Sequence, residues 1–386
     1  MKKSTISKRE FIRRCAIGAG VAALGISDFD VFGTILNKQN QIMNKPIDIW
    51  KWHKQAAYFS KTDKGIMCGL CPNACIIPEK GTGICKTRVI FDDALYAINY
   101  GNPCSINTDP VEKKPLYHFL PQTTVFSLAT AGCNFNCLNC QNWQISQVSP
   151  FETENYDLMP GDVVAYALKN KCTSIGYTYS EPVVFYEYVF DTAKLAHEKG
   201  LKNIFISNGY INETPLRAIC KHLDAANINL KSFSDETYRK LNGGSLNTIK
   251  RNLNVFKEEG VWLEITNLVI PTWTDDMDMI KKMCDWLYNS GLGKFPLHFN
   301  RFMPAYKLTQ LPVTPVETLE KARDIAINAG IEFVYIGNVP GTKSDDTYCP
   351  KCKKVLIERN GYTNISNNMK NGKCGFCNEP INGVWS

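Results

Sequence analysis

Three cysteines in one short loop are the residues of this chain best suited to redox or metal chemistry. In the run Ala131-Gly-Cys133-Asn-Phe-Asn-Cys137-Leu-Asn-Cys140, three residues and then two separate them. Thiolates at this spacing can wrap one corner of a cubane [4Fe-4S] cluster and leave the fourth iron without a protein ligand, as ligation of a substrate requires. A structural zinc site or a fully ligated cluster would need a fourth cysteine nearby, and none follows before Cys172. We therefore predict that Cys133, Cys137 and Cys140 are cluster ligands with a catalytic role.

Two further sets of four cysteines flank this loop. They are Cys68, Cys71, Cys75 and Cys85 on its N-terminal side, and Cys349, Cys352, Cys374 and Cys377 on its C-terminal side. The N-terminal set predicts either zinc, which would only fold its lobe, or an auxiliary [4Fe-4S] cluster, which would relay electrons or bind substrate; ligand type alone does not separate the two. For the C-terminal set, paired CxxC steps favour a structural zinc in a ribbon-like or rubredoxin-like lobe. The other five cysteines are expected to have structural or incidental roles.

The elements that must position these ligands follow from an alternating pattern between residues 123 and 338. Short β-rich runs alternate with amphipathic helical stretches. Strands are predicted at 124–130, 173–179, 203–208, 226–232, 261–270 and 296–302, and helices at 162–170, 183–199, 215–223, 246–259, 277–290 and 316–329. Six β/α repeats predict an α/β fold with a parallel sheet, and a partial (β/α)6 barrel of the TIM type is favoured over a flat doubly wound sheet. A seventh strand at 332–337 would close one edge.

The three-cysteine loop directly follows the first predicted strand. It therefore lies at the carboxyl end of a barrel strand, where barrel active sites form. We divide the chain into a signal-like segment and linker (1–45), a cysteine-rich N-terminal lobe (46–120), a core barrel (121–343) and a ribbon-like lobe with four cysteines (344–386).

The first residues resemble an export signal. Ser7-Lys8-Arg9-Glu10-Phe11 is similar to a twin-arginine motif with Lys8 in place of the first arginine, and a short apolar run at 15–26 fits a signal h-region better than a membrane span. No clear Ala-x-Ala cleavage site follows this run. A cytoplasmic location and export or tethering through this segment both stay open.

Composition narrows the classes of partner. The chain has 386 residues, of which 44% are hydrophobic, enough for one large domain with one or two small ones. Its formal charge of +7 is modest and its basic residues are spread along the chain, so we expect no nucleic-acid partner. A zinc-dependent nucleic-acid binder is disfavoured because no basic aromatic groove is apparent.

Five stretches carry a resemblance to a known family. They are Cys68-Gly-Leu-Cys71-Pro, the run from Asp109 to Phe119, Cys133 to Ser146 with Cys140-Gln-Asn-Trp143, Tyr177-Thr-Tyr-Ser-Glu-Pro182 and His298-Phe-Asn-Arg-Phe302. Through them the chain, from residue 65 to 386, resembles the AmmeMemoRadiSam system radical S-adenosylmethionine (SAM) enzymes, relatives of pyruvate formate-lyase-activating enzymes. The resemblance implies that an electron passes from the cluster to the sulfonium of SAM. Cleavage then gives methionine and a 5′-deoxyadenosyl radical, which abstracts hydrogen from an unknown substrate, a protein by analogy with activating enzymes or a small molecule.

The same resemblance implies partners and site residues. The partners are a low-potential electron donor of the flavodoxin or ferredoxin type, and AMME-type and Memo-type proteins. The SAM-binding residues are Glu181 for the methionine amino group, Ser207 or Asn208 at the third strand, Lys231 for the carboxylate, and His298. Glu181 could instead be an ordinary acid at a helix N-terminus, and His298 a satisfied core residue.

Other residues of the resembling stretches have further expected roles. Arg301 would bind ribose or a substrate anion, or form a surface salt bridge. Lys113, Lys114 and His118 would dock the N-terminal lobe on the barrel. Asn139 stands where the superfamily often has an aromatic residue near adenine, so adenine packing must come from elsewhere. A second class of function is an iron–sulfur electron carrier, or a sensor that binds SAM without turnover; formation of 5′-deoxyadenosine would separate the two classes.

Overall fold

The computed structural model describes residues 49–78 and 80–386. The twin-arginine-like segment and the linker expected at 1–45 lie outside the described residues. In the described part of the chain, no helix combines the length and apolarity needed to cross a bilayer.

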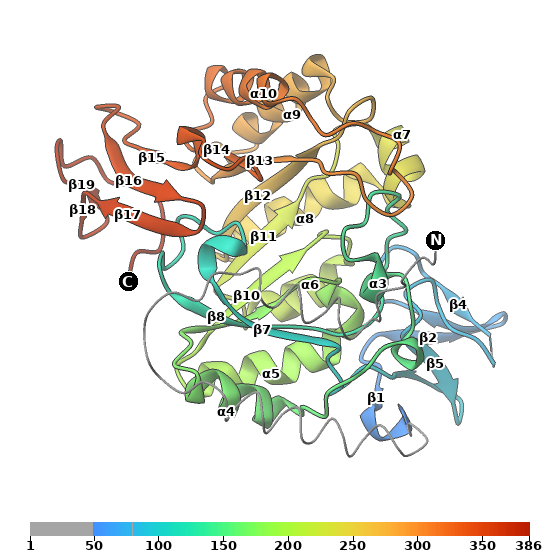
Figure 1. Ribbon diagram of the computed structural model, residues 1–386. Helices are drawn as coiled ribbons and strands as arrows, with labels where there is room; N and C mark the ends of the chain where they lie inside the picture. The colour runs from blue at the N-terminus through green and yellow to red at the C-terminus, as the bar shows by residue number, and fades with distance from the viewer. Residues whose placement is uncertain (1–48, 79) are drawn as a thin grey trace, which may run out of the picture. The chain divides into compact units, whose positions relative to one another are not determined.

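An eight-stranded sheet forms the centre of the fold (Figure 1). Its order is β14-β13-β12-β11-β10-β9-β8-β7, and the strands from β8 to β14 are parallel. Their bounds are β7 Ser105–Pro110, β8 Thr124–Ala129, β9 Ser174–Tyr177, β10 Lys202–Ser207, β11 Ala225–Asn229, β12 Trp262–Val269, β13 Leu297–Arg301 and β14 Val334–Gly337. Because each strand lies next to its predecessor in sequence, the sheet is singly wound. The predicted parallel sheet of an open barrel is therefore confirmed.

Six helices follow the strands and lie along the outside of the curved sheet (Figure 1). They are α4 Pro160–Lys169, α5 Tyr186–Glu198, α6 Glu213–Cys220, α8 Leu246–Glu258, α9 Met277–Asn289 and α10 Val316–Asn328. In α8 the buried residues include Leu246, Ile249, Leu253 and Phe256, spaced so that they share one face. The apolar face of α8 packs against β12 and the neighbouring α6, so the strand–helix alternation builds the core.

Short helices fill the connections. They are η1 Ile49–Trp52, η2 Val111–Lys113, α3 Trp143–Ser146, η3 Pro150–Glu152, η4 Pro182–Phe185, α7 Asp235–Thr237, the π-helical η5 Tyr238–Asn242 and η6 Lys343–Asp345. Four of them bear on the candidate site: η2 and α3 contribute Lys113 and Ser146 to its lining, and η4 and η5 contact residues of it.

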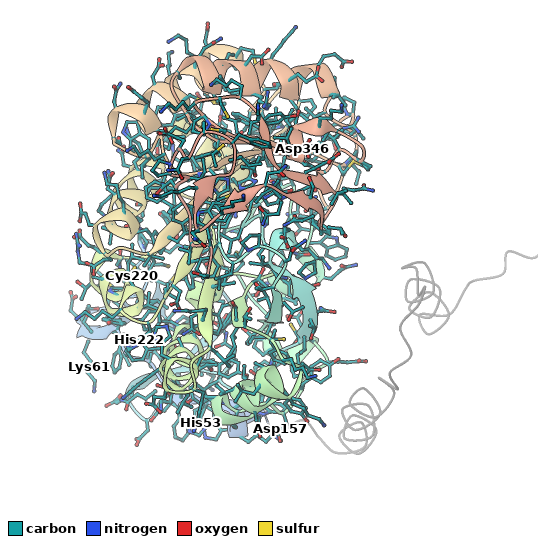
Figure 2. The ribbon with its side chains drawn as sticks, turned by 90° about the vertical axis from the view of Figure 1, so that its left-hand side faces the viewer. His53, Lys61, Asp157, Cys220, His222 and Asp346 are labelled. Atoms are coloured by element: carbon teal, nitrogen blue, oxygen red, sulfur yellow. The ribbon has the colours of Figure 1, made fainter. Side chains whose placement is uncertain are left out.

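The N-terminal cysteines lie in a lobe of two small antiparallel sheets, ordered β1-β6-β5 and β2-β3-β4; Cys68 ends β3 and the other three are in the connections. Their strands are β1 Lys54–Gln55, β2 Phe59–Thr62, β3 Gly65–Cys68, β4 Ile76–Ile77, β5 Arg88–Phe91 and β6 Ala94–Ala97. Asp157, just before α4, accepts hydrogen bonds from Trp52 Nε1 at 3.0 Å and Lys51 Nζ at 2.8 Å. Figure 2 shows Asp157 near His53 at this end of the sheet, where the lobe is attached to the barrel.

The C-terminal cysteines belong to a second small lobe at the other end of the sheet. In Figure 2, Lys61 lies in the N-terminal lobe and Asp346 lies in the C-terminal lobe. Its strands are β15 Thr347–Tyr348, β16 Val355–Asn360, β17 Thr363–Asn367, β18 Met369–Lys370 and β19 Lys373–Cys374. They form a three-stranded sheet and a two-stranded hairpin, all antiparallel.

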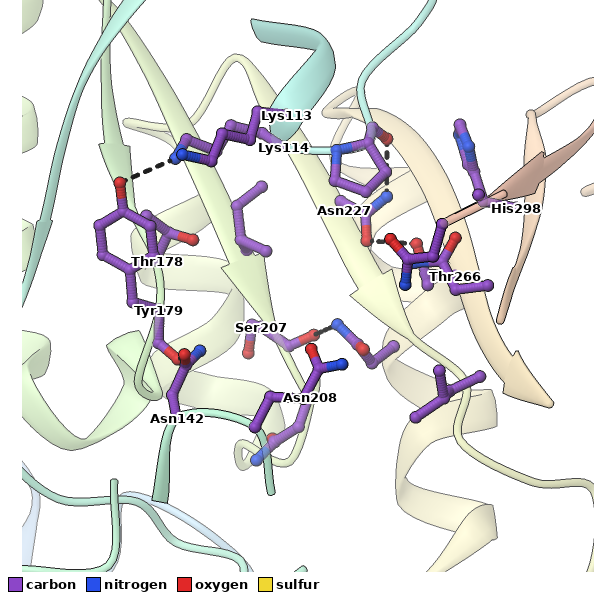
Figure 3. A pocket seen from close by; sticks show the side chains of 18 of the residues that line it. Lys113, Lys114, Asn142, Thr178, Tyr179, Ser207, Asn208, Asn227, Thr266 and His298 are labelled. Carbon is purple, nitrogen blue, oxygen red and sulfur yellow. Dashed lines mark hydrogen bonds between the residues drawn. The ribbon is translucent and has the colours of Figure 1, made fainter. Parts of the chain in front are cut away.

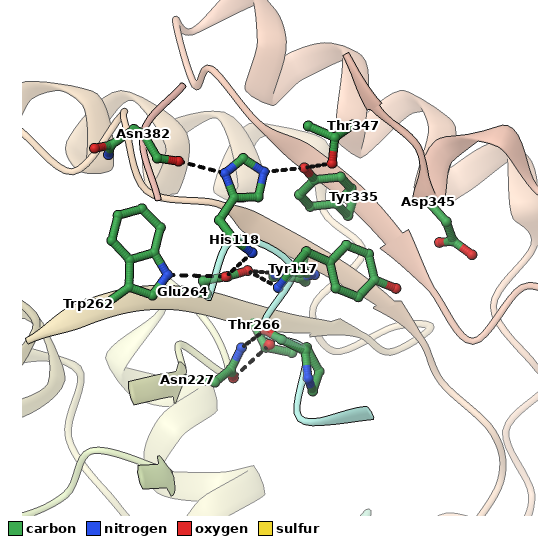
Figure 4. A network of polar contacts seen from close by, with 12 residues as sticks. Tyr117, His118, Asn227, Trp262, Glu264, Thr266, Tyr335, Asp345, Thr347 and Asn382 are labelled. Carbon is green, nitrogen blue, oxygen red and sulfur yellow. Dashed lines mark hydrogen bonds and ion pairs between the residues drawn. The ribbon is translucent and has the colours of Figure 1, made fainter. Parts of the chain in front are cut away.

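His118 joins this C-terminal lobe to the barrel (Figure 4). Its Nδ1 lies 2.7 Å from the carbonyl oxygen of Asn382, and its Nε2 lies 2.6 Å from the hydroxyl of Tyr335. Burial lowers the pKa of His118 to about 4, so the ring is neutral at pH 7. A neutral ring that donates from Nδ1 and accepts at Nε2 satisfies both contacts. As expected, His118 links residues 46–120 to the barrel, through Tyr335 and through its backbone N–H, which donates to Glu264 Oε1 at 2.8 Å; its ring also binds the C-terminal segment.

Candidate active site

The three-cysteine loop begins directly after β8 and is fixed by backbone hydrogen bonds. Asn136 N and Leu138 N donate to the carbonyl oxygens of Asn242 and Leu241 in η5, each at 2.9 Å. Gly132 has φ +100°, and a Cβ there would lie 2.4 Å from the carbonyl oxygen of Cys85. Only glycine fits this close approach. These contacts hold the loop against η5 and against the backbone of Cys85.

A cavity of about 660 Å³ opens at the carboxyl ends of the barrel strands (Figure 3). It is lined by the three cysteines and by all five predicted SAM-binding residues: Cys133, Cys137, Cys140, Glu181, Ser207, Asn208, Lys231 and His298. The volume is typical of a site for a small molecule or cofactor. The structure therefore brings together residues that span more than 160 positions of sequence.

Glu181 is a buried carboxylate that lines this cavity. Its Oε1 accepts hydrogen bonds from Ser207 Oγ at 2.6 Å and Val183 N at 3.1 Å, and its Oε2 accepts one from Asn208 N at 2.8 Å. Burial raises the pKa of Glu181 to about 7, although the hydrogen bonds oppose the shift. Glu181 caps η4, so the alternative of a helix-terminal acid also holds.

Asn208 connects the third strand to the cysteine loop. Its Nδ2 donates to Asn134 Oδ1 at 2.8 Å, and Asn134 Nδ2 donates to the carbonyl oxygen of Tyr210 at 2.7 Å. Asn134 directly follows Cys133. The carboxylate of Glu181 and the first cysteine are thus held by one network of hydrogen bonds.

Lys231 and His298 lie on the same cavity with different surroundings. Within the described residues the Lys231 ammonium has no hydrogen-bond or ion-pair partner, which leaves it able to bind an anion. His298 is 1% exposed, and its Nε2 lies 2.7 Å from Glu264 Oε2. Burial by itself would raise the pKa of Glu264, but the hydrogen bond and charge of His298 lower it below its usual value. His298 is therefore both a satisfied core residue and part of the cavity wall.

Comparison with known proteins identifies the family. Residues 127–287 match the radical SAM superfamily. An uncharacterized protein of Methanocaldococcus jannaschii is 43% identical over 331 residues, which cover 85% of this chain and 98% of that protein. The chain belongs to the radical SAM superfamily. Its chemistry is accordingly radical SAM chemistry, with cleavage of SAM, and it is an enzyme of that superfamily.

Two further similarities concern activating enzymes. The pyruvate formate-lyase 1-activating enzyme of Escherichia coli K12 is 23% identical over 221 residues, covering 53% of this chain and 89% of that enzyme. The crystal structure of a domain of a pyruvate-formate lyase-activating enzyme from Bacteroides vulgatus has a TM-score of 0.37 and 15% identity, covering 43% of this chain and 99% of that domain.

Sequence reasoning missed several residues that line the cavity of this radical SAM enzyme. They include Asn142, Thr178, Tyr179, Asn227, Thr266 and Tyr362. Asn227 and Thr266 lie on neighbouring strands, where Thr266 Oγ1 donates to Asn227 Oδ1 at 2.9 Å (Figure 3). Polar residues inside buried strand runs were the available signal. Tyr362 is half exposed and also lies on the cavity wall.

The basic residues of the Asp109–Phe119 stretch also have a definite place. Lys114 is 2% exposed, and its Nζ lies 2.6 Å from Asp109 Oδ2 and 3.3 Å from the Tyr179 hydroxyl. Lys113 Nζ contacts the other carboxylate oxygen of Asp109 at 2.8 Å. Both lysines line the cavity. Arg301 is not among its lining residues and donates from Nε to the carbonyl oxygen of Thr314.

The chemistry of the donor set fits a cluster with SAM. Three thiols of one loop reach a cavity that also holds a carboxylate, an unpaired ammonium and the buried Oδ1 of Asn139, which has no hydrogen-bond partner among the described residues. Burial raises the pKa of the Cys133 thiol well above its usual value, so a bound metal would be needed to stabilise the thiolate. An unpartnered buried acceptor is costly unless a ligand supplies the donor.

The four C-terminal thiols have the geometry of a single-ion site. Cys349 Sγ lies 3.6 Å from Cys377 Sγ, and Cys352 Sγ lies 3.7 Å from Cys374 Sγ. All four sulfurs lie within 4.8 Å of one another. A Zn–S bond of about 2.3 Å in a tetrahedron places sulfurs about 3.8 Å apart. This set could therefore hold one metal ion.

Proposed function

We propose that this enzyme reductively cleaves SAM at a [4Fe-4S] cluster held by Cys133, Cys137 and Cys140, and uses the product radical to abstract hydrogen from a substrate. The observation that carries the proposal is the meeting of a three-thiol loop and the buried Glu181 carboxylate on one cavity. When bound, the reduced cluster supplies the electron that splits the sulfonium into methionine and a 5′-deoxyadenosyl radical. Three protein ligands leave one iron open for SAM.

Each neighbouring residue has a role in orienting SAM. Glu181 accepts from the methionine ammonium, since a carboxylate forms a strong, charge-assisted bond with it. Lys231 binds the methionine carboxylate. Ser207 and Asn208 hold Glu181 in place through the two short hydrogen bonds described above. Asn139 Oδ1 is a free acceptor suited to an amino group such as that of adenine.

The remaining part of the cavity is where we place the substrate. Lys113, Lys114 and the β16–β17 turn with Tyr362 line it, away from the cysteine loop in sequence. Similarity to pyruvate formate-lyase-activating enzymes supports a protein substrate and an activating-enzyme-like oxidoreductase; a small molecule is the second candidate. The proposal includes a flavodoxin-type or ferredoxin-type donor and AMME-type and Memo-type partner proteins.

Three further assignments belong to the proposal. The thiol distances support a structural zinc at the C-terminal set, which would make residues 344–386 a zinc-ribbon-like lobe. The other parts of the proposed division are a lobe at 46–120 and a barrel at 121–343.

The location in the cell is proposed as cytoplasmic, or exported or tethered through the twin-arginine-like segment. Requirement for SAM and a low-potential electron donor favours the first of these locations.

The test is formation of 5′-deoxyadenosine by the anaerobically reconstituted protein with dithionite and SAM. Cys137→Ala should abolish the product, because it removes one of three cluster ligands. Cys104→Ala is the matched control, since this thiol lies outside all three cysteine sets and should leave the product unchanged. No product from a wild-type protein with a verified, reducible cluster would instead support an electron carrier or a SAM-binding sensor.

A further inference from the structure

The three-cysteine loop has one side that lines the SAM cavity and another side that faces solvent. Cys133 and Cys140 line the cavity. Asn136 of the loop is exposed, and so are Trp143 and Gln144 in α3, the short helix that follows the loop. A protein that delivers electrons must approach the loop closely, because electron transfer slows steeply with distance. When SAM and substrate fill the cavity, such a protein has to approach from the exposed side.

The segment that follows β13 is attached to this exposed side. Lys307 N donates a hydrogen bond to the carbonyl oxygen of Leu138 at 2.9 Å, and Leu138 lies between Cys137 and Cys140 in the sequence. Phe302, at the start of the same segment, packs in one apolar cluster with Leu138. Covalent bonds and one hydrogen bond therefore connect two predicted cluster ligands to the backbone of an exposed lysine, which gives an electron a short path.

Large side chains are exposed beside this path. The rings of Trp143 and Tyr306 stack with their centroids 5.5 Å apart and their planes inclined by 17°. Trp143 is 40% exposed, and Met303, in the same segment as Tyr306, is 47% exposed. Tyr, Trp and Met are residue types that protein–protein interfaces favour. The surface formed by α3 and residues 302–311, which we call the α3 face, therefore has the composition of a docking surface.

The α3 face carries no carboxylate of its own. Residues 131–151 and 302–316 contain neither Asp nor Glu. Lys307 is exposed, and its Nζ lies 5.2 Å from the centroid of the Tyr306 ring. It forms no ion pair with any carboxylate in the part of the chain that the structure describes. A lysine without an acidic neighbour attracts a partner with an acidic surface and repels a basic one.

The neighbouring elements do not reverse this charge. Lys86, also exposed, donates from Nζ to the carbonyl oxygen of Gln147 at 2.6 Å, directly after α3. The exposed Glu152 is the carboxylate that acts on Lys86, since this lysine lowers the pKa of Glu152 together with the hydrogen bonds from Ser149. The acids and bases of α7 and η5 pair with one another, Asp235 with Arg239 and Glu236 with Lys240. The net charge around the α3 face is therefore set by Lys307.

We propose that the α3 face docks the low-potential electron carrier of this enzyme, a small protein with an acidic surface around its redox centre. The carrier gives up one electron and is oxidised, and the cluster held by Cys133, Cys137 and Cys140 takes up that electron and is reduced. In Figure 1, α3 lies on the right and the C-terminal lobe on the left, so a carrier at α3 leaves the side of the C-terminal lobe open to the substrate. The inference rests on the proposed function for its electron acceptor, whereas docking itself requires no turnover.

The first test measures binding of flavodoxin, an acidic one-electron carrier, to the reconstituted full chain by calorimetric titration at low salt. Lys307→Glu reverses the charge of the exposed lysine and should raise the dissociation constant about tenfold, while Lys307→Gln should raise it about threefold. Met303→Glu places a carboxylate on the same face and should also weaken binding, about threefold or more. Rising salt should weaken binding by the wild type more than binding by Lys307→Glu.

Lys169→Glu is the matched control for this titration. Lys169 is exposed and ends α4, the helix that leads into β9, so it lies at the amino ends of the strands, away from the cysteine loop. Its replacement should leave the dissociation constant within about twofold of wild type. The docking proposal is wrong if Lys307→Glu and Met303→Glu both bind flavodoxin within twofold of wild type, or if wild type binds neither flavodoxin nor a ferredoxin. Two independent variants keep the test valid if one of them fails to fold.

The second test measures formation of 5′-deoxyadenosine with two reductants. With reduced flavodoxin, Lys307→Glu should have a KM for flavodoxin about tenfold above that of wild type and an unchanged kcat. With dithionite, which needs no docking surface, variant and wild type should form the product at the same rate. The two proposals fail separately. Binding that depends on Lys307, without product from either reductant, would refute the proposed function and keep the docking site; product with equal KM values for flavodoxin would do the reverse.

Discussion

Replacement of Glu181 by glutamine should weaken SAM binding without loss of the cluster. The carboxylate receives three hydrogen bonds from the protein, two on Oε1 and one on Oε2. A carboxylate offers about four acceptor positions, so one on Oε2 remains for the methionine ammonium. Glutamine keeps an oxygen that can accept hydrogen bonds from Ser207 and Val183. Its amide nitrogen would face the Asn208 N–H, and a nitrogen of this kind can accept a hydrogen bond neither from that group nor from the methionine ammonium.

The magnitude follows from the lost bond. A hydrogen bond between charged groups is worth about 1.5–3 kcal/mol, and every 1.4 kcal/mol is tenfold in affinity. The dissociation constant for SAM should therefore rise about 10- to 150-fold in Glu181→Gln. Ser207→Ala removes one neutral donor to the same carboxylate and leaves its charge, so its effect should be smaller, about tenfold or less.

The pH dependence gives a second, independent readout. Burial raises the pKa of Glu181 to about 7 in the absence of ligand, so the carboxylate is ionised above that pH and protonated below it. The ammonium of SAM binds the ionised form. SAM affinity of the wild type should therefore fall as pH decreases from 7, approaching about tenfold per unit, while Glu181→Gln should show no such fall.

Both readouts come from SAM titrations of the reduced, reconstituted protein, followed by the change in the EPR spectrum of the cluster. The comparison is valid only if each variant holds as much iron and sulfide per chain as the wild type. If Glu181→Gln binds SAM within twofold of wild type at pH 7.5, and wild-type affinity is flat between pH 5.5 and 7, Glu181 does not bind the ammonium and the orientation of SAM in this cavity is wrong.

Three other substitutions test neighbouring parts of the structure. Asn242→Ala removes the Nδ2 donor 3.2 Å from Cys137 Sγ. Loss of a bond worth about 0.5–1.5 kcal/mol should lower the reduction potential of the cluster by about 20–65 mV in an EPR-monitored redox titration. An unchanged potential would refute this bond. Cys352→Ala should remove one zinc per chain by metal analysis and expose the C-terminal lobe to proteolysis; zinc content equal to wild type would exclude this site. Lys114→Met removes the buried partner at 2.6 Å from Asp109, but the carboxylate keeps Lys113 at 2.8 Å, so the variant should lose about 1.5–3 kcal/mol in denaturant unfolding, with a loss below about 0.5 kcal/mol counting against it.

The barrel was predictable because its strands are buried on both faces. In β8 every residue from Val125 to Ala129 is buried, and the run is apolar except for Ser127 and is bounded by Thr124 and Thr130. The edge strand β7 was missed for the opposite reason. Its Asn107 and Thr108 are exposed, and Pro110 ends it, so it reads as a loop until the register from Ser105–Ala129 to Pro110–Thr124 is known.

The meeting of the five predicted SAM-binding residues on one cavity was predictable from topology and resemblance together, because parallel strands bring their carboxyl ends to one place. Contacts made by residues far apart in sequence were not predictable. His118 N and Tyr117 N both donate to the buried Glu264 carboxylate, about 146 residues away, and the same carboxylate contacts His298 (Figure 4). Nothing in the local sequence of Glu264 marks it as the acid that organises two histidines.

The cysteine sets show where sequence spacing stops being informative. Cys68 and Cys71 have the same CxxC step as Cys349 and Cys352, so the pattern assigns both pairs to metal binding and cannot distinguish their ligands. Spacing along the chain determines which cysteines lie in the same turn. The kind of metal site that they can form depends on the distances between sulfurs contributed by different turns. Those distances depend on packing: Gly132 lets the active-site loop approach Cys85, and the hairpin β18–β19 brings Cys374 to Cys352. The close approach of all four C-terminal sulfurs, within 4.8 Å of one another, is therefore a property of the fold that the CxxC step alone does not specify.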